Sequence, residues 1–520
     1  MVRLRKLSQL AFLMFFAYAL FSTVLTAFVP VHAFLAASPL SAGAAILAGR
    51  SFAGLPWTAV LAAAVLLSAV AVGGVFCGWV CPLGTVLDVT DRLLPGRKRR
   101  AGRQGPARLV KAKYVALTAI LVGAAFGADW AGWLDPISLS TRVFVSVIHP
   151  TLDWAGNGLL ALSIDRLGLT GLEGWRQWLA DGLGRPMLAA PGASWISLPI
   201  WAGTAVGLVL LGLYQSRFWC RNLCPLGALL GACGRYSLLN VRIGEGCIEC
   251  RRCSQVCPTG AIQGRKVSPT ECIRCFNCTS RKLCPAVGVT HRFGPWLRRN
   301  RDEYLARLPG RRLVLASAAG ALVALPLLSS RVPGLWKRRR LLRPPGAPQE
   351  PEFLARCIRC GRCMKACPNN ALQPTVLEAG VEGFWSPRLV PRVGYCLYDC
   401  AGLEHEHNNR CGMSCPTGAI RRLTFAERSQ DVGRMGLARL EQERCIPYAD
   451  GVNCSMCVPV CPVAALAENV RPEEGALSDD ADAGLRLPYV LEERCIGCGA
   501  CEFVCPVHGP AAIRVHPHAT

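Results

Sequence analysis

Cysteine constrains this chain of 520 residues more than any other feature, because 29 cysteines fall into short clusters that mostly end in Cys-Pro. A small secreted domain with many cysteines would suggest a disulfide framework. Closely spaced, proline-terminated clusters instead favour metal ligation, since neighbouring thiolates can converge on one centre. The pattern therefore predicts several metal sites along the chain.

Two cysteine quartets in the middle of the chain carry the spacings C-x2-C-x2-C-x3-C-P and C-x2-C-x2-C-x5-C-P. Their members are Cys247, Cys250, Cys253, Cys257 and Cys272, Cys275, Cys278, Cys284. In two-cluster ferredoxins the first three cysteines of a run hold one cluster and the fourth reaches the other. We therefore predict that Cys284 completes the first [4Fe–4S] site and Cys257 the second. Zinc is the alternative, although zinc sites rarely use this run with a trailing proline.

Four further quartets occupy the last third of the chain. The two with regular spacing are Cys357, Cys360, Cys363, Cys367 and Cys495, Cys498, Cys501, Cys505. The two with stretched gaps are Cys396, Cys400, Cys411, Cys415 and Cys445, Cys454, Cys457, Cys461. Stretched gaps still let four thiolates converge, because the loop between ligands can bulge outward. By analogy with polyferredoxins, we expect the outer two quartets to exchange fourth ligands, and the inner two likewise.

The longest gap carries Glu404-His405-Glu406-His407-Asn408-Asn409, which is either a second metal site or a solvated loop. Its polarity and lack of periodicity favour the loop.

Five apolar segments predict helices in the first two thirds of the chain. They are Leu10–Val29, Trp57–Phe76, Tyr114–Ala128, Leu198–Tyr214 and Leu313–Leu328. A membrane helix needs about 20 residues, so the third and fifth segments are short for a span. The first has an alternative interpretation as a cleaved signal peptide, because Val31-His32-Ala33 resembles a cleavage site.

The charge distribution suggests how these helices are oriented. Residues 1–344 hold 41 basic and 13 acidic side chains, whereas residues 345–520 hold 17 and 21. Loop 77–113 alone carries nine Lys and Arg, so the positive-inside rule places it in the cytoplasm with the amino terminus and the segment after Tyr214. The net charge of +24 therefore reflects topology, and we expect no nucleic-acid partner.

A short repeat follows the second and fourth apolar segments. Both copies read Cys-x3-Cys-Pro-Leu-Gly, with Cys77 and Cys81 in the first and Cys220 and Cys224 in the second. Two such units suggest pseudo-symmetric halves that bring four thiols together at a further iron–sulfur or zinc site. Redox-active or merely structural thiols are the alternatives, since a gap of three is not the usual ferredoxin spacing. Cys233 is unpaired and reads as a small buried residue.

These patterns predict an α-helical membrane domain with four spans and a probable fifth, plus α+β ferredoxin-like 4Fe-4S modules. Short β-prone stretches between the quartets, such as residues 258–262 and their near copy 416–420, support the ferredoxin alternation. We expect four parts. Residues 1–235 form the membrane helices with both repeats, and residues 236–295 form a cytoplasmic two-cluster module. Residues 296–344 hold a basic segment and the fifth helix, and residues 345–520 form a four-cluster domain.

With these motifs, residues 1–290 resemble the NapH/MauN membrane ferredoxin family. Residues 311–520, with Arg311-Arg312 before an apolar run and the segment CIRCGRCMKACP, resemble the NapG/MauM polyferredoxin family. The resemblance implies a natural fusion of two subunits in the bacterial inner membrane that relays electrons from quinol to a periplasmic oxidoreductase or cytochrome c. A nitrate-reductase-like system is one example of the acceptor, and methylamine utilisation is another system served by relatives.

The side of the membrane reached by the carboxy-terminal domain rests on two opposing signals. Arg311-Arg312 resembles the twin-arginine export signal of NapG-like proteins, and the domain's net charge of −4 also favours the periplasm. Lys337-Arg338-Arg339-Arg340 after the apolar run favours the cytoplasm. We expect the periplasmic location.

The predicted function is quinol oxidation coupled to a relay of about six [4Fe–4S] clusters. Neither a C-x2-C-H haem motif nor a nucleotide-binding GxGxxG after a strand occurs. Quinone has no motif, and its candidate contacts, which also read as interfacial anchors, are Trp79, Arg217, Trp219 and Arg221. The alternatives are a module that supplies electrons for a partner's cofactor assembly without quinol turnover, and a complex subunit that runs electrons in the opposite direction.

Overall fold

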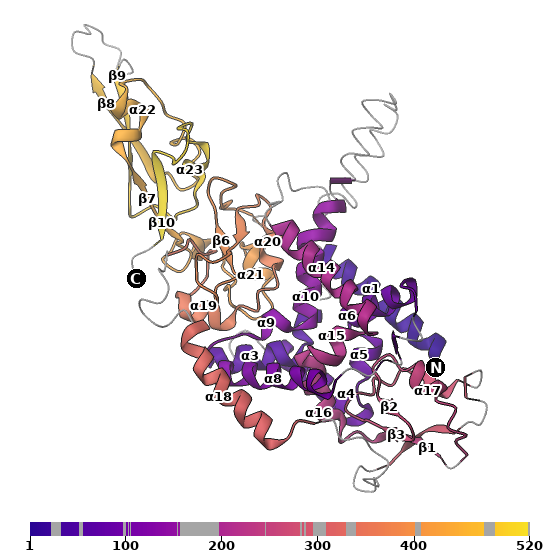
Figure 1. Cartoon of the computed structure of the whole chain (residues 1–520). Helices are drawn as coiled ribbons and strands as arrows, with labels where there is room; N and C mark the ends of the chain where they lie inside the picture. The colour runs from indigo at the N-terminus through magenta and orange to yellow at the C-terminus, as the bar shows by residue number, and fades with distance from the viewer. Residues whose placement is uncertain are drawn as a thin grey trace, which may run out of the picture. The chain divides into compact units, whose positions relative to one another are not determined.

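The computed structural model describes residues 1–21, 33–50, 56–96, 100–101, 103, 106–152, 154–155, 197–244, 246–280, 283–284, 288–294, 308–328, 340–400, 407–472 and 484–517 (Figure 1). The chain divides into two compact units. Unit 1 comprises Met1–Leu152, Ile196–Arg331 and Ala355–Cys360, and unit 2 comprises Asp153–Trp195, Val332–Leu354 and Gly361–Thr520. The predicted metal-site loop 404–406 and most of the basic run 337–340 lie outside the described residues.

Each predicted apolar segment overlaps a helix of unit 1. These helices are α1 (Val2–Phe21), α4 (Pro56–Val72), α8 (Ala107–Ala125), α14 (Ser197–Tyr214) and α18 (Arg311–Leu328). Runs of Ala, Leu and Val favour helix because they carry no competing polar groups. By length and composition, α1 and α18 are the two described helices that can cross a membrane, and α4 and α14 are shorter apolar helices. The four-span arrangement is therefore still a prediction.

Shorter helices surround these five. They are α2 (Ala33–Ala36), α3 (Pro39–Gly49), α5 (Val75–Trp79), α6 (Pro82–Leu93), α9 (Ala131–Leu134), α10 (Pro136–Val143), the π-helical turn η1 (Phe144–Ile148), α15 (Phe218–Asn222) and α16 (Pro225–Gly234). Helix α8 packs against α3, α16 and α18, and α4 packs against α3 and α16. Asp135 begins α10 by accepting hydrogen bonds from the backbone N–H groups of Ile137 and Ser138.

The rest of unit 1 is a small α+β module. Strand β1 (Leu239–Ile243) pairs antiparallel with β4 (Val289–Phe293), with Val241 opposite His291. Between them lie the short turn α17 (Arg252–Gln255), the hairpin of β2 (Ile262–Gln263) and β3 (Lys266–Val267), and the 3-10 turn η5 (Asn277–Thr279). This order confirms ferredoxin-like modules as part of the fold.

Unit 2 contains three further antiparallel pairs. These are β5 (Leu372–Pro374) with β6 (Pro387–Leu389), β7 (Gly436–Leu440) with β10 (Ile513–Pro517), and β8 (Leu466–Pro472) with β9 (Gly484–Val490). Its helical turns are α20 (Arg362–Ala366), α21 (Arg410–Met413), η8 (Ala426–Arg428), η9 (Gln442–Arg444), α22 (Ile446–Ala449) and α23 (Ala500–Val504). Helix α19 (Glu350–Arg356) crosses the division between the units.

Candidate iron–sulfur sites

The first predicted site of unit 1 is a cavity lined by four cysteines. Cys247, Cys250, Cys253 and Cys284 all border a cavity with about 640 Å³ of empty space. The first three come from the loop before and within α17, and Cys284 comes from the loop after η5. The structure therefore brings together the set that the exchange of fourth ligands predicts.

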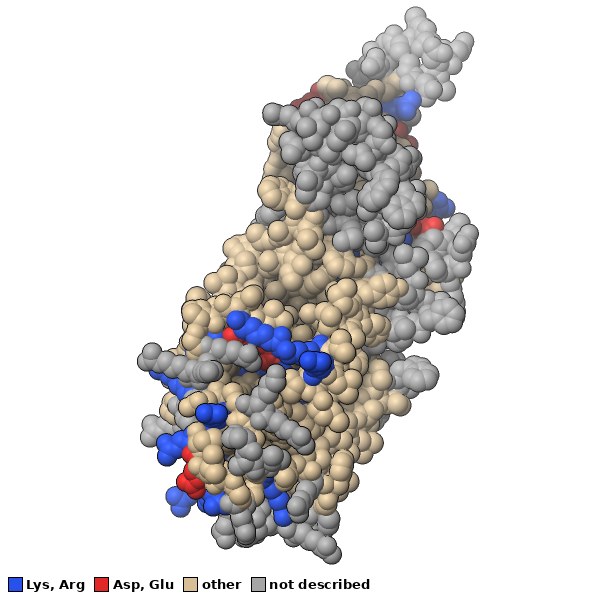
Figure 2. Space-filling model, turned by 90° about the vertical axis from the view of Figure 1, so that its right-hand side faces the viewer, with Lys and Arg blue, Asp and Glu red and all other residues tan. Residues whose placement is uncertain are grey.

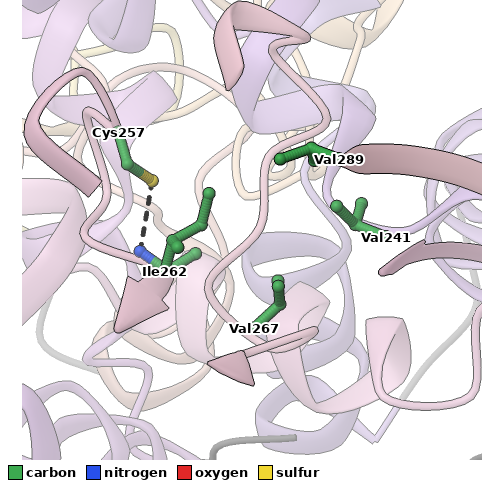
Figure 3. Close-up of a cluster of buried hydrophobic side chains, with 6 residues drawn as sticks. Val241, Cys257, Ile262, Val267 and Val289 are labelled. Carbon is green, nitrogen blue, oxygen red and sulfur yellow. Dashed lines mark hydrogen bonds between the residues drawn. The ribbon is translucent and has the colours of Figure 1, made fainter. Parts of the chain in front are cut away.

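The second site of unit 1 gathers Cys257, Cys272, Cys275 and Cys278 around a smaller cavity of about 380 Å³. Cys257 is buried beside Val241, Ile262, Val267 and Val289, which Figure 3 shows around its side chain. The Cys257 sulfur accepts a hydrogen bond of 3.2 Å from the backbone N–H of Ala261. Apolar packing and the β2–β3 hairpin thus carry the fourth cysteine of one quartet to the other three.

The first site of unit 2 gathers Cys495, Cys498 and Cys501 with Cys461, and all four line one cavity. Burial raises the pKa of the Cys457 thiol to about 12, and the charges of Cys445, Cys454 and Cys505 raise it further. The quartets that end in Cys461 and Cys505 therefore exchange their fourth cysteines with each other.

The stretched quartet before them lies close to the last cysteine of the quartet that precedes it in sequence. Burial raises the pKa of Cys411, and the neighbouring charges of Cys396, Cys400 and Cys367 raise it further. Cys367, the last cysteine of the preceding quartet, therefore lies with Cys396, Cys400 and Cys411.

We expected the first and last of the four quartets in residues 345–520 to exchange fourth ligands, and the two quartets between them likewise. This expectation is wrong, because Cys461 of an inner quartet lies with Cys495, Cys498 and Cys501 of an outer one. The reason is a hairpin between consecutive quartets. Strands β8 and β9 lie between Cys461 and Cys495, and β5 and β6 lie between Cys367 and Cys396. Each hairpin folds the chain back on itself, so the quartets that meet are sequence neighbours.

The two four-cysteine groups of unit 2 are in direct backbone contact. The N–H of Cys396 donates a hydrogen bond of 2.8 Å to the carbonyl of Cys498. The rings of Tyr395 and Phe503 lie beside this bond, with their centroids 5.3 Å apart. A ligand of one predicted cluster is thus bonded to a ligand of the next.

Arg428 contacts the stretched site directly and was not identified from the sequence. Its guanidinium is buried, with Nη2 at 3.1 Å from the Cys396 sulfur and Nη1 at 3.6 Å from the Cys400 sulfur. It also donates to the carbonyls of Asn408 and Leu397. Arg428 is 28 residues from Cys400 in sequence, so no local spacing signals this contact.

The CxxxCP repeat has the same local structure in both copies. Cys77 lies in α5 and Cys220 in α15, whereas Cys81 and Cys224 precede α6 and α16, each of which begins with proline. Proline suits this first helical position because its missing N–H has no partner there.

The four repeat thiols are buried close to one another. Burial raises the pKa of Cys77 to about 12, and the charge of Cys220 raises it further. The pKa of Cys224 is also raised by burial and then by Cys220, Cys77 and Cys81. The thiols therefore act on one another electrostatically, and a metal site formed by all four is still a prediction.

A buried ionic network supports the repeat. Arg217 donates from Nε to Asp88 at 2.7 Å, and its other nitrogens donate to the carbonyls of Cys77 and Gly84. Burial acts to raise the pKa of Asp88, but the charges of Arg217 and Arg5 lower it to about 2. Trp79 donates from Nε1 to the carbonyl of Arg274 at 3.1 Å. Arg217 and Trp79, two of the four candidate quinone contacts, thus make internal bonds.

The chemistry of the cysteine cavities fits [4Fe–4S] clusters. Among the described residues, no three His, Cys, Asp or Glu side chains are placed to hold a single metal ion. A cubane binds each thiolate to a different iron, so its four sulfurs surround a hollow instead of one ion. Cavities bordered by four cysteines, with backbone N–H donors to sulfur, match that requirement.

The fold and these cavities define the class of protein, an iron–sulfur protein with ferredoxin-type domains. Models for a 4Fe-4S binding domain match residues 53–101 and 197–244, and, separately, 242–263 and 354–373. A model for a 4Fe-4S dicluster domain matches residues 451–509. The first pair covers both CxxxCP repeats, and the last covers most of the two quartets that exchange Cys461 and Cys505.

The chain belongs to the family of ferredoxin-type proteins that includes MauM and NapG. It is 36% identical over 225 residues to "Methylamine utilization ferredoxin-type protein MauM" of Paracoccus denitrificans, covering 41% of this chain and 92% of the relative. It is 34% identical over 202 residues to "Ferredoxin-type protein NapG" of Escherichia coli, covering 39% and 79%. No solved structure matches the chain.

Proposed function

We propose that this iron–sulfur electron-transfer protein takes electrons from membrane quinol and passes them through about six [4Fe–4S] clusters to a periplasmic oxidoreductase or cytochrome c. The main observation in support of the relay is the hydrogen bond from the Cys396 N–H to the Cys498 carbonyl. It joins two sites through ligand backbones, which gives electrons a short covalent and hydrogen-bonded path.

The 24 proposed cluster ligands are the six cysteine quartets, with fourth cysteines exchanged between consecutive quartets. When bound, the clusters supply one-electron redox chemistry, and the protein sets their potentials through burial, charge and hydrogen bonds to sulfur. Backbone N–H groups bond to cysteine sulfurs in two of these sites, at 3.1 to 3.4 Å: Ala261 to Cys257 in unit 1, and Ala465 and Ala438 to Cys461 and Cys495 of one site in unit 2. The four repeat cysteines are proposed to hold a further cluster.

The helices of unit 1 are proposed to form a multi-pass inner-membrane domain. Several of their apolar side chains are exposed, including Leu67 of α4, Leu210 of α14 and Leu315 of α18, at 56 to 70%. Exposed apolar faces on these helices suit a lipid environment. On the face drawn in Figure 2, broad areas carry no charged side chain, a band of Lys and Arg crosses the middle, and further Lys and Arg are scattered below it.

The two-cluster module is held firmly against these helices. Lys113 of α8 donates two hydrogen bonds to the Glu271 carboxylate, at 2.7 and 2.8 Å, and both side chains are buried. Arg274 donates to the carbonyl of Val72 at the end of α4, at 3.0 Å. Glu271 and Arg274 flank Cys272 in sequence, so the second cluster site is fixed at the helical domain, where a quinol would deliver electrons.

The test is reduction of the purified full-length protein by quinol. Anaerobic addition of decylubiquinol or menadiol should bleach the cluster absorbance in proportion to the quinol added. If dithionite reduces the clusters while neither quinol does, the relay from quinol is wrong and a role in supplying a partner's cofactor assembly is favoured. Protease added to intact spheroplasts should cut residues 345–520 if that domain faces the periplasm.

A further inference from the structure

A cavity of about 1300 Å³, including its open mouth, lies in unit 1 between the first turn of α1 and the cluster loops of the two-cluster module. Helices α1 and α6 contribute Val2, Arg5 and Asp91 to its lining, and the module contributes Val256 and Asn277. The rest of the lining mixes basic, polar and apolar groups. Such a mixture suits a ligand with a polar ring and an apolar body.

Arg5 is the unusual group in this lining. The residue is 2% exposed, and its Nη2 donates a hydrogen bond to Asp88 at 3.3 Å. In the described part of the chain, Nε and Nη1 are buried with no hydrogen-bond partner. Burying such donors without an acceptor costs about 1 to 3 kcal/mol each, so native proteins usually provide one. A ligand with oxygen acceptors in the cavity would satisfy them.

The cavity adjoins the second cluster site. Asn277 lines both this cavity and the one that gathers Cys257, Cys272, Cys275 and Cys278. The charge of Cys275 also acts on the Arg5 guanidinium. A molecule held by Arg5 would therefore lie next to a cluster that can accept its electrons.

The same end of α1 presents an apolar surface. Leu4, Leu7 and Leu10 are 55 to 65% exposed, so an apolar face runs along the helix from the level of the cavity. A quinone has two ring oxygens that accept hydrogen bonds and an isoprenoid tail that belongs in lipid. The cavity and the helix face offer a place for each part.

We propose that this cavity binds the headgroup of the quinol and quinone, with Arg5 donating to a ring oxygen and the tail lying along α1. The proposal rests on the proposed function and adds the place where the substrate binds. Oxidation of one quinol breaks two O–H bonds, and it releases two protons to water and two electrons. The electrons go singly to two oxidised [4Fe–4S] clusters, each of which is reduced by one.

The experiment uses the full-length protein in detergent and measures binding as well as electron transfer. Decylubiquinone binding is followed by quenching of tryptophan fluorescence, and decylubiquinol oxidation by bleaching of the clusters. Arg5→Met removes the donors, and Arg5→Lys keeps the charge. Val2→Trp fills the cavity without touching the Asp88 network. Arg3→Met is the matched control, because Arg3 is exposed on the same helix and does not line the cavity.

We expect Arg5→Met and Val2→Trp to weaken decylubiquinone binding at least tenfold, with Arg5→Lys intermediate and Arg3→Met unchanged. Iron content and reduction by dithionite should be unchanged in all four, which shows that the clusters assemble. Unchanged quinone binding in both Arg5→Met and Val2→Trp would overturn the site, even if the wild type oxidises quinol. Quinone binding that depends on Arg5, without cluster reduction by quinol, would instead overturn the proposed function and keep the site.

A phospholipid headgroup also carries oxygen acceptors, and a separate arm tests it. The same titrations are repeated in nanodiscs of phosphatidylcholine alone and with added cardiolipin. If Arg5→Met weakens cardiolipin binding while its decylubiquinone affinity equals that of the wild type, the cavity is a lipid site and the quinone proposal is wrong. Equal quinone affinity in both membranes supports it.

Discussion

The two-cluster module of unit 1 and the paired sites of unit 2 share one plan but are secured differently. In each, a hairpin joins consecutive quartets and a fourth cysteine crosses over. The module of unit 1 is anchored to helices by buried ion pairs and backbone bonds, such as Lys113 with Glu271 and Arg274 with Val72. The sites of unit 2 bond to each other through Cys396 and Cys498.

Under the proposed function, this difference assigns electron entry to unit 1 and transfer between clusters to unit 2. In the proposed relay, the anchoring in unit 1 would fix the second cluster site at the helices, where its position would set the rate at which electrons enter. The bond in unit 2 couples one cluster site to the next, where spacing and relative potential govern transfer. The stretched quartet also differs in its contact with Arg428, which donates to the Cys396 and Cys400 sulfurs.

The largest predicted effect tests the exchange of fourth ligands in unit 2. Cys461→Ser combined with Cys495→Ser should lose no more iron than Cys495→Ser alone, because both changes remove ligands of one site. Cys461→Ser combined with Cys445→Ser should lose the iron of two clusters. Iron analysis and EPR spin counting measure this, and the reverse pattern would show that each quartet binds its own cluster.

The next largest effect concerns the anchoring of unit 1. Lys113→Met leaves the Glu271 carboxylate buried without its cation, so we expect a loss of about 3 to 5 kcal/mol in the free energy of unfolding. Thermal melting in detergent measures the loss, and Glu271→Gln added to Lys113→Met should recover part of it. Lys111→Met is the matched control on the same helix. Equal melting temperatures for Lys113→Met and Lys111→Met would show that the Lys113–Glu271 pair does not anchor the module.

A smaller effect separates the stretched site from the others. Removing the Arg428 charge and its bonds to sulfur should make reduction of that cluster harder, since positive charge and hydrogen bonds stabilise the reduced state. For Arg428→Gln we expect a fall of about tenfold in the ratio of reduced to oxidised cluster at fixed potential, about 59 mV for one electron.

EPR-monitored redox titration of the full-length protein measures this shift. Arg428→Lys should fall between the wild type and Arg428→Gln. Arg422→Gln, an exposed position in the same segment, should titrate like the wild type. Identical titrations for all variants would mean that Arg428 does not set the reduction potential of the stretched site, and the contrast between the sites would be lost.

The smallest effect is a pH dependence in unit 1. Burial, and then the charge of Arg274, lowers the pKa of His291 to about 4, below its usual value of 6.5. The unfolded chain therefore binds more protons, so stability should fall as pH drops from 6.5 towards 4. Because the His291 ring is partly exposed, we expect the loss in the free energy of unfolding to be below about 1 kcal/mol. The melting temperatures of the wild type and His291→Phe should diverge between pH 7.5 and pH 5. Parallel curves would contradict a contribution of His291 to the pH dependence.

Much of the site follows from local spacing. Three cysteines separated by two residues must wrap one small centre, because a tight loop brings their thiolates together whatever surrounds it. The exchange of Cys257 and Cys284 was predictable from the same spacing. The five apolar runs likewise specify helices without information from the rest of the fold, and each overlaps a helix in the described part of the chain.

Other features depend on contacts between distant residues. The incorrect nesting in unit 2 came from an analogy with polyferredoxins, whereas the pairing follows hairpins whose short strands give weak signals in the sequence. Arg428 reads as an ordinary surface arginine in sequence, and so does Arg5. Only folding shows that the first reaches two cluster sulfurs and that the second is buried with unused donors.

The sequence by itself determined the cofactor chemistry and the helical segments, because both depend on residues within a few positions of each other. Tertiary structure alone decided which quartets share ligands, which arginines meet a cluster or a cavity, and how the two-cluster module is fixed to α8. The physical reason is that burial, charge pairing and hairpin closure join residues tens to hundreds of positions apart, where spacing carries no information.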